Sequence, residues 1–207
     1  DEIGPNLYSV FFQPEEVINA IQPTSSPYLS LLPAVTDLVA IELELVDKMA
    51  REYYLADLLK PLDSRYDYIL LDCPPSLELL TLNALCASNS ILVPVQGEYF
   101  ALEGLSDLMN TVRIVRRSMN PSLDIEGVLL TMFDGRTNLS IQVAQEVKRF
   151  FGSKVYSTVI PRNVRLSEAP SHGKPVNAYD GSSRGSVAYQ RLTEELLEHN
   201  PLPGKEG

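Results

Sequence analysis

The residue in this sequence that is best suited to a chemical role is an aspartate at the end of an apolar run. Residues 65–76 read RYDYILLDCPPS, so the run ends at Asp72 and two prolines prevent a strand from continuing. Phosphate-binding α/β sheets hold Mg²⁺ with a carboxylate at the end of a buried parallel strand. A carboxylate that caps the next helix is the structural alternative, because Asp is a good N-cap. Asp72 is therefore a candidate magnesium residue.

The loop that would bind phosphates is not in this sequence. There is no Gly-x-x-x-x-Gly-Lys-Ser/Thr motif, and the two Gly-Lys pairs, at 173–174 and 204–205, are followed by proline and by glutamate. The sequence therefore resembles most of a nucleotide switch whose phosphate-binding loop lies outside the 207 residues.

Two later loops carry further candidate side chains. Residues 131–138 (TMFDGRTN) and 160–165 (IPRNVR) each follow a predicted strand, so both should lie at the same sheet edge as the carboxylate. Met132 and Pro161 offer apolar surfaces suited to a purine, and the amide of Asn163 could read its edge. Ordinary turn formation is the alternative, since Asp-Gly and Pro-x-Asn favour turns.

Arg136 and Arg165 lie in these loops and have no acidic residue at the i,i+4 spacing of an obvious ion pair. Exposed arginines are mostly solvated surface. Two arginines on one rim would suit a nucleic-acid backbone, because such contact needs charge and reach but no reading of bases. The net charge of −10 argues against coating nucleic acid by bulk electrostatics, although residues 162–174 are locally basic.

Alternating strands and helices would position these loops. Such βα repeats with short connections predict an α/β fold, with a mostly parallel twisted sheet and helices on both faces. We expect one domain over residues 1–207, with 200–207 as a flexible tail. Strands are predicted at residues 28–32, 68–71, 91–95, 127–132 and 155–160, and the later helices at 77–87, 101–119, 139–151 and 186–198.

Composition narrows the class of protein. Apolar residues make up 44% of the chain, and its longest apolar runs are far shorter than a membrane span. Two cysteines form no disulfide framework, so a reducing cytoplasm is the expected compartment. The start at Asp1 rather than Met leads us to expect an incomplete chain.

Four segments together resemble one family. The sequence is similar to the ParA/Soj family of DNA-partitioning ATPases, within the deviant-Walker group of P-loop NTPases that includes MinD. The likeness runs from about residue 7 to the last helix. Its segments are residues 66–76 (YDYILLDCPPS), 94–105 (PVQGEYFALEGL), 127–134 (GVLLTMFD) and 160–175 (IPRNVRLSEAPSHGKP).

The resemblance implies roles for the cofactor residues. Asp72 would be the Walker B aspartate that touches Mg²⁺ through water. Pro161 and Asn163, with Met132, would line the adenine site of ATP.

The resemblance also implies partners and a location. Arg136 and Arg165 match positions that the family uses for sequence-independent DNA binding by its ATP-bound homodimer. A ParB-type centromere-binding protein would stimulate hydrolysis, and the protein would act in the cytoplasm on the nucleoid, not on a membrane.

The chain departs from the family pattern at its start. The family's opening strand, its Lys-Gly-Gly-x-Gly-Lys-Thr loop and its first helix are missing, as is the strand bearing an aspartate that positions the attacking water. We therefore expect no ATP hydrolysis by this polypeptide alone. The lost strand normally pairs beside the Asp72 strand, so we also expect unpaired backbone edges and marginal stability or association.

Three alternatives stay open. A non-catalytic interaction module that lost its phosphate loop is the main rival to an incomplete ATPase. A MinD-like membrane positioner needs a basic amphipathic C-terminal helix, whereas residues 192–199 contain three glutamates. A redox role like that of the nitrogenase iron protein is the weakest, since Cys73 lies beside the candidate metal residue and Cys86 within a predicted helix.

Overall fold

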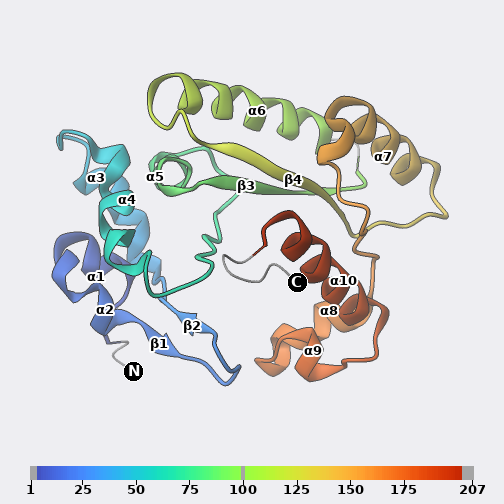
Figure 1. Cartoon of the computed structure of the whole chain (residues 1–207), viewed down its shortest axis with the longest axis horizontal. Coiled ribbons are helices and arrows are strands. Elements are labelled where there is room, and N and C mark those ends of the chain that lie inside the picture. The colour runs from blue at the N-terminus through green and yellow to red at the C-terminus, as the bar shows by residue number, and fades with distance from the viewer. Residues whose placement is uncertain (1–3, 99–100, 202–207) are drawn as a thin grey trace. The chain divides into compact units, whose positions relative to one another are not determined.

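The computed structural model describes residues 4–98 and 101–201. Contacts divide the chain into two compact units (Figure 1): Asp1–Asn89 with Thr111–Leu123, and Ser90–Asn110 with Asp124–Gly207. The single domain expected from the sequence stays a prediction. Most of the expected tail, at 202–207, lies outside the described residues.

Short helices build the first unit, because prolines interrupt its sequence repeatedly. Its core centres on Val10, Ile41 and Leu45, each with 0% exposure. Two strands, β1 and β2, pair antiparallel, which confirms a short strand within the predicted 28–32. The elements are α1 (Leu7–Phe12), α2 (Val17–Ala20), β1 (Gln22–Pro23), β2 (Ser30–Leu31), α3 (Ile41–Glu44), α4 (Tyr54–Leu59) and α5 (Leu79–Ala87).

Two buried asparagines tie the first unit together. The side-chain oxygen of Asn83 accepts from the backbone N–H of Leu55 at 3.1 Å, and its amide nitrogen donates to the carbonyl of Arg51 at 2.9 Å. The amide of Asn120 donates to the carbonyl of Leu85 at 3.0 Å and to that of Ser88 at 2.8 Å. These bonds satisfy backbone groups at helix ends that burial would otherwise leave unpaired.

A pair of parallel strands forms the centre of the second unit. Strand β3 (Ser90–Gln96) runs beside β4 (Asp124–Thr131), with Val93 opposite Val128 and a register irregularity between Ile91 and Leu92. Both strands were predicted at nearly these bounds from their apolar runs. Parallel strands need a crossover connection between them, and here that connection contains α6 (Ala101–Ser118).

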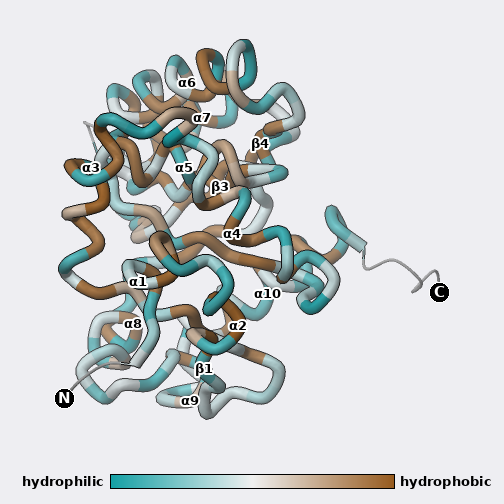
Figure 2. Tube along the Cα trace, turned by 90° about the vertical axis from the view of Figure 1, so that its left-hand side faces the viewer, coloured by the Kyte–Doolittle hydropathy of each residue, from teal (hydrophilic) through white to brown (hydrophobic). Residues whose placement is uncertain are grey.

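Helices cover both faces of this strand pair, as predicted (Figure 1). Because side chains alternate along a strand, Val128 and Leu130 of β4 pack with α6 and α7 (Asn138–Phe151). The residue between them, Leu129, packs with α10 (Arg184–His199) on the other face. Figure 2 shows hydrophobic and hydrophilic residues interspersed along α6, as expected of a helix with one face on a sheet.

The predicted strand at 155–160 follows β4 without forming a regular ladder. Its backbone donates from Tyr156 to Val128 at 3.0 Å and from Ile160 to Leu130 at 2.9 Å. Four residues therefore oppose two, so the segment bulges at 157–159. The carboxylate of Glu195 on α10 accepts from the N–H groups of Ser157 at 2.6 Å and Thr158 at 2.8 Å. That carboxylate replaces the acceptors of a regular strand.

The predicted strand at 68–71 is wrong: residues 66–74 form no strand or helix in the described chain. Tyr66 and Leu71 pack on the core of the first unit, whereas Leu70 is 83% exposed. A strand requires a hydrogen-bonding neighbour, and none of the described strands is paired with this segment. An apolar run alone does not supply the hydrogen-bonded neighbour that a strand needs.

Short helices follow the 155–160 segment. The short ones are α8 (Val164–Glu168) and α9 (Val176–Tyr179). The long helix α10 comes after them, where the sequence predicts a helix at 186–198. The side chain of Ser183 caps α10 by accepting from the N–H of Ser186. Within the described residues, none of the helices combines the length and the apolar character needed to cross a membrane.

Candidate functional site

The two loops that the sequence singles out lie side by side within the second unit. The N–H of Phe133 donates to the carbonyl of Ile160 at 3.0 Å, and the N–H of Arg162 donates back to Phe133 at 3.1 Å. Phe133 and Pro161 form a parallel bridge. The expected meeting of these loops is therefore correct. Asp72 belongs to the first unit, so its approach to them stays a prediction.

The three proposed adenine residues surround this junction. Met132 has a φ of 49°, which is rare for a residue other than glycine, and its side chain is 41% exposed. Pro161 and Asn163 are half-buried. The side-chain oxygen of Asn163 accepts from the N–H of Arg165 at 2.9 Å and so caps α8. The side chain of Asn163 thus positions the backbone of Arg165, one of the two proposed DNA-binding residues.

Arg136 is held by an acidic neighbour two residues away, a spacing other than i,i+4. Its guanidinium donates to both carboxylate oxygens of Asp134, at 2.8 and 2.7 Å. The arginine side chain is nevertheless 89% exposed. Hydrogen bonds from Arg136 lower the pKa of Asp134 to about 2, so the carboxylate stays charged at neutral pH.

Arg165 is more closely engaged, with two acidic partners, neither of them at the i,i+4 spacing. Its Nη1 lies 2.8 Å from Glu168, and its Nε lies 3.2 Å from Asp180. The first pair has i,i+3 spacing on α8, a separation at which helical side chains meet. Hydrogen bonding and charge interaction with Glu168 raise the pKa of Arg165. The guanidinium therefore faces two carboxylates.

The candidate magnesium residue, Asp72, lies on the surface of the first unit. Asp72 is exposed, and the described residues contain no group of three or more His, Cys, Asp or Glu side chains able to hold a metal ion. Neighbouring Cys73 has a raised pKa, first through burial and then through the charge of Asp72, so its thiol is protonated at neutral pH.

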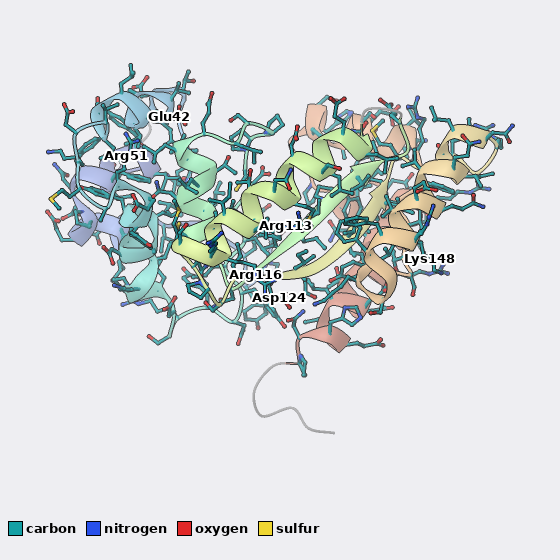
Figure 3. All side chains as sticks on the ribbon, turned by 90° about the horizontal axis from the view of Figure 1, so that it is seen from above. Glu42, Arg51, Arg113, Arg116, Asp124 and Lys148 are labelled. Carbon is teal, nitrogen blue, oxygen red and sulfur yellow. The ribbon has the colours of Figure 1, made fainter. Side chains whose placement is uncertain are left out.

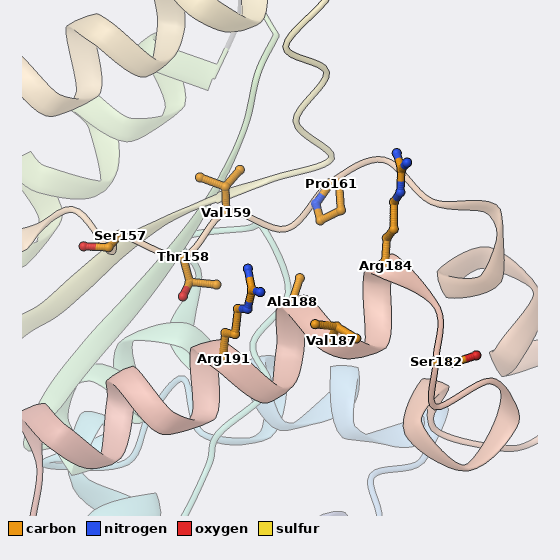
Figure 4. A pocket seen from close by; sticks show the side chains of 9 residues that line it. All are labelled: Ser157, Thr158, Val159, Pro161, Ser182, Arg184, Val187, Ala188 and Arg191. Carbon is orange, nitrogen blue, oxygen red and sulfur yellow. The ribbon is translucent and has the colours of Figure 1, made fainter.

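A groove of about 610 Å³ lies between the bulged segment and α10 (Figure 4). Arg184 and Arg191 contribute charge to it, and Val159, Val187 and Ala188 contribute apolar surface. Figure 4 shows Arg191 extending from α10 toward Thr158. The groove shares one residue, Pro161, with the proposed adenine site.

Sequence reasoning missed the acidic partners of both arginines. The signals were present: Asp134 lies two residues before Arg136 in a turn, and Glu168 follows Arg165 at i,i+3. Asp180 gave no local signal, because only the fold brings it to Arg165. Other basic side chains, such as Arg113 and Arg116, lie on α6 and have interactions of their own (Figure 3).

Comparison with known proteins identifies the family. The sporulation initiation inhibitor protein Soj of Bacillus subtilis is 55% identical over 190 residues, which cover 92% of this chain and 75% of Soj. The chain belongs to the ParA/Soj family. The chromosome partitioning protein ParA of Myxococcus xanthus is 48% identical over 97% of this chain and 71% of its own length. A family model described as an AAA domain matches residues 1–125.

A solved structure supports the fold of this ParA/Soj chain. Cobyrinic acid a,c-diamide synthase from Mycobacterium smegmatis, crystallised with ADP and magnesium, superposes with a TM-score of 0.81 at 32% identity. The match covers 96% of this chain and 74% of the synthase. The fold is accordingly the α/β fold of P-loop NTPases of the deviant-Walker type, as the sequence predicts.

Proposed function

We propose that this protein acts in chromosome or plasmid partitioning as a ParA-type ATPase whose ATP-bound homodimer binds DNA without sequence preference. The observation that carries the proposal is its 48% identity to the chromosome partitioning protein ParA of M. xanthus over 97% of the chain. In support, the loops bearing Arg136 and Arg165 are joined by hydrogen bonds through Phe133. Both arginines would then contact phosphates without reading bases.

Nucleotide binding would use the same loop pair. Met132 and Pro161 would pack on the adenine of ATP. Because the Asn163 oxygen already caps α8, its NH₂ group would be the one that reads the purine edge. Asp72 would contact Mg²⁺ through water once the phosphate-binding groups are supplied. Solved structures with bound ADP and magnesium, such as the M. smegmatis synthase, support a nucleotide at this fold.

A ParB-type protein is the proposed partner that stimulates hydrolysis, since relatives such as the ParA of M. xanthus are chromosome partitioning proteins. The proposed place of action is the nucleoid in the cytoplasm. The 207-residue chain by itself should hydrolyse no ATP, because it has no phosphate-binding loop. A phosphate-release assay with ATP and Mg²⁺ tests this expectation, and turnover above the buffer rate would contradict it.

DNA binding tests the main proposal. The protein expressed from its complete gene, with ATP and Mg²⁺, should bind a labelled duplex with an affinity that falls steeply with salt and varies little with sequence. Arg136→Ala and Arg165→Ala should each weaken binding and make the salt dependence shallower. Lys154→Ala is the control, because Lys154 pairs with Asp124 away from both loops. Unchanged affinity in both arginine variants would defeat the assignment.

A non-catalytic interaction module is the second candidate, because the 207 residues contain no phosphate-binding motif. Reading the gene upstream of the codon for Asp1 separates the two candidates. An in-frame phosphate-binding loop there supports the ATPase. A start codon directly before Asp1 supports the module.

A further inference from the structure

The surroundings of the two proposed DNA-binding arginines differ in charge. Arg136 faces one carboxylate, Asp134, and its side chain is 89% exposed. Arg165 faces two carboxylates, Glu168 and Asp180, and its side chain is 46% exposed. One positive charge against two negative charges leaves the Arg165 cluster net negative. A phosphate that approaches Arg165 therefore meets two carboxylates, whereas one that approaches Arg136 meets a single carboxylate.

The Arg165 cluster is also held in place by its neighbours. The hydroxyl of Tyr179 donates to Glu168 at 3.3 Å, and the ring of Tyr179 stacks on His172 at 4.8 Å. The hydroxyl of Ser182 donates to Asp180 at 3.1 Å. Asp180 directly follows α9, so the ion pairs join α8 to the start of the connection into α10.

We infer that Glu168 and Asp180 set the DNA affinity of this face, because they hold Arg165 in an intramolecular cluster that a DNA phosphate must displace. The inference rests on the proposed DNA binding by Arg165 and adds its regulation. In the cluster, the Nε and Nη1 donors of Arg165 point at carboxylates rather than outward. DNA gains this contact only when those donors exchange a carboxylate for a phosphate.

The size of the effect follows from the exposure of the groups. All three side chains are between 30% and 46% exposed, so each ion pair is weak and can be exchanged at equilibrium. Removing one carboxylate charge should therefore tighten DNA binding by about 1.5- to 5-fold at low salt. If Arg165 then binds one more phosphate, the slope of log affinity against log salt should steepen by about 0.9.

Two conservative substitutions test the inference by anisotropy of a labelled duplex, with ATP and Mg²⁺ and the protein from its complete gene. Asp180→Asn keeps an acceptor for Ser182, and Glu168→Gln keeps an acceptor for Tyr179. Both should bind DNA more tightly than wild type, with a steeper salt dependence. Asp124→Asn is the matched control, because it removes one negative charge at the start of β4, seven residues before the loops.

The double variant Arg165→Ala with Asp180→Asn separates a specific effect from a general charge effect. It should bind like Arg165→Ala alone, since no guanidinium is left to release. Equal tightening with and without Arg165, or in Asp124→Asn, would overturn the inference. So would unchanged affinity in Asp180→Asn and Glu168→Gln when Arg165→Ala still weakens binding. If neither Arg136→Ala nor Arg165→Ala weakens binding, the proposed function itself fails.

Discussion

Two apolar segments, residues 155–160 and residues 68–72, differ in what surrounds their backbones. The first lies beside β4, with Tyr156 and Ile160 only 3% and 2% exposed. The second leaves Leu70 83% and Ile69 37% exposed. Neither is a regular strand. The difference teaches that an apolar run becomes part of a sheet only where a neighbouring backbone and a covering helix are both available.

Truncating a buried side chain should show the largest contrast between the segments. Ile160→Ala removes contacts to the cluster of Leu129 and α10, so it should cost about 2–5 kcal/mol of unfolding free energy. The matched change Leu70→Ala should alter that free energy by less than about 0.5 kcal/mol, because the side chain is already in water. Denaturant unfolding followed by circular dichroism measures both. Equal losses would contradict the comparison.

Adding a side chain to β4 where it faces Tyr156 should have the next largest effect on stability. A Cβ at Gly127 would overlap the ring of Tyr156 and lie 3.0 Å from the carbonyl of Lys154. Gly127→Ala should therefore destabilise the protein by about 1–3 kcal/mol. Gly104→Ala on α6 is the control, since a Cβ there meets nothing within 4 Å and alanine favours a helix. A melting temperature that falls equally in both variants would contradict the packing argument.

Weakening the carboxylate that holds the bulge should have a smaller effect. Glutamine at position 195 has one oxygen, so Glu195→Gln leaves one of the N–H groups of Ser157 and Thr158 without its acceptor. We expect the free energy of unfolding to fall by about 1 kcal/mol or less, because these groups are partly exposed to water.

The pH dependence of stability gives a second measurement at this position. Burial alone would raise the pKa of Glu195, but the hydrogen bonds from Ser157 and Thr158 lower it overall. Its contribution is therefore complete above the unfolded pKa, near 4.3, and is lost as pH falls through the lower folded pKa. Glu195→Gln should remove this acid-limb component. An identical acid limb in both proteins would contradict the role of Glu195.

A surface charge in the other segment should change stability least. Leu70→Asp should shift the melting temperature very little, yet it should reduce self-association because it places a charge in an exposed apolar run. Light scattering over a concentration series measures this. The variant Glu103→Asp on α6 keeps the net charge and serves as the control. Unchanged scattering in Leu70→Asp would show that this segment does not drive association.

Local sequence patterns were enough to predict the regular elements of the second unit and to propose the residues of its candidate site. The apolar runs of β3 and β4 and the spacing on α6 and α7 depend only on local periodicity, so their positions could be predicted. The loops of Met132 and Asn163 could be placed together because parallel strands end at one edge.

Only the tertiary structure decided which apolar runs became strands and which charges were paired. Residues 68–71 had the right composition but no ladder, and residues 155–160 bulged onto Glu195, which lies far away in sequence. Asp180 reached Arg165 through the packing of α8 and α9. Periodicity reports what one segment can bury, whereas hydrogen-bond and charge partners depend on which distant segments fold beside it.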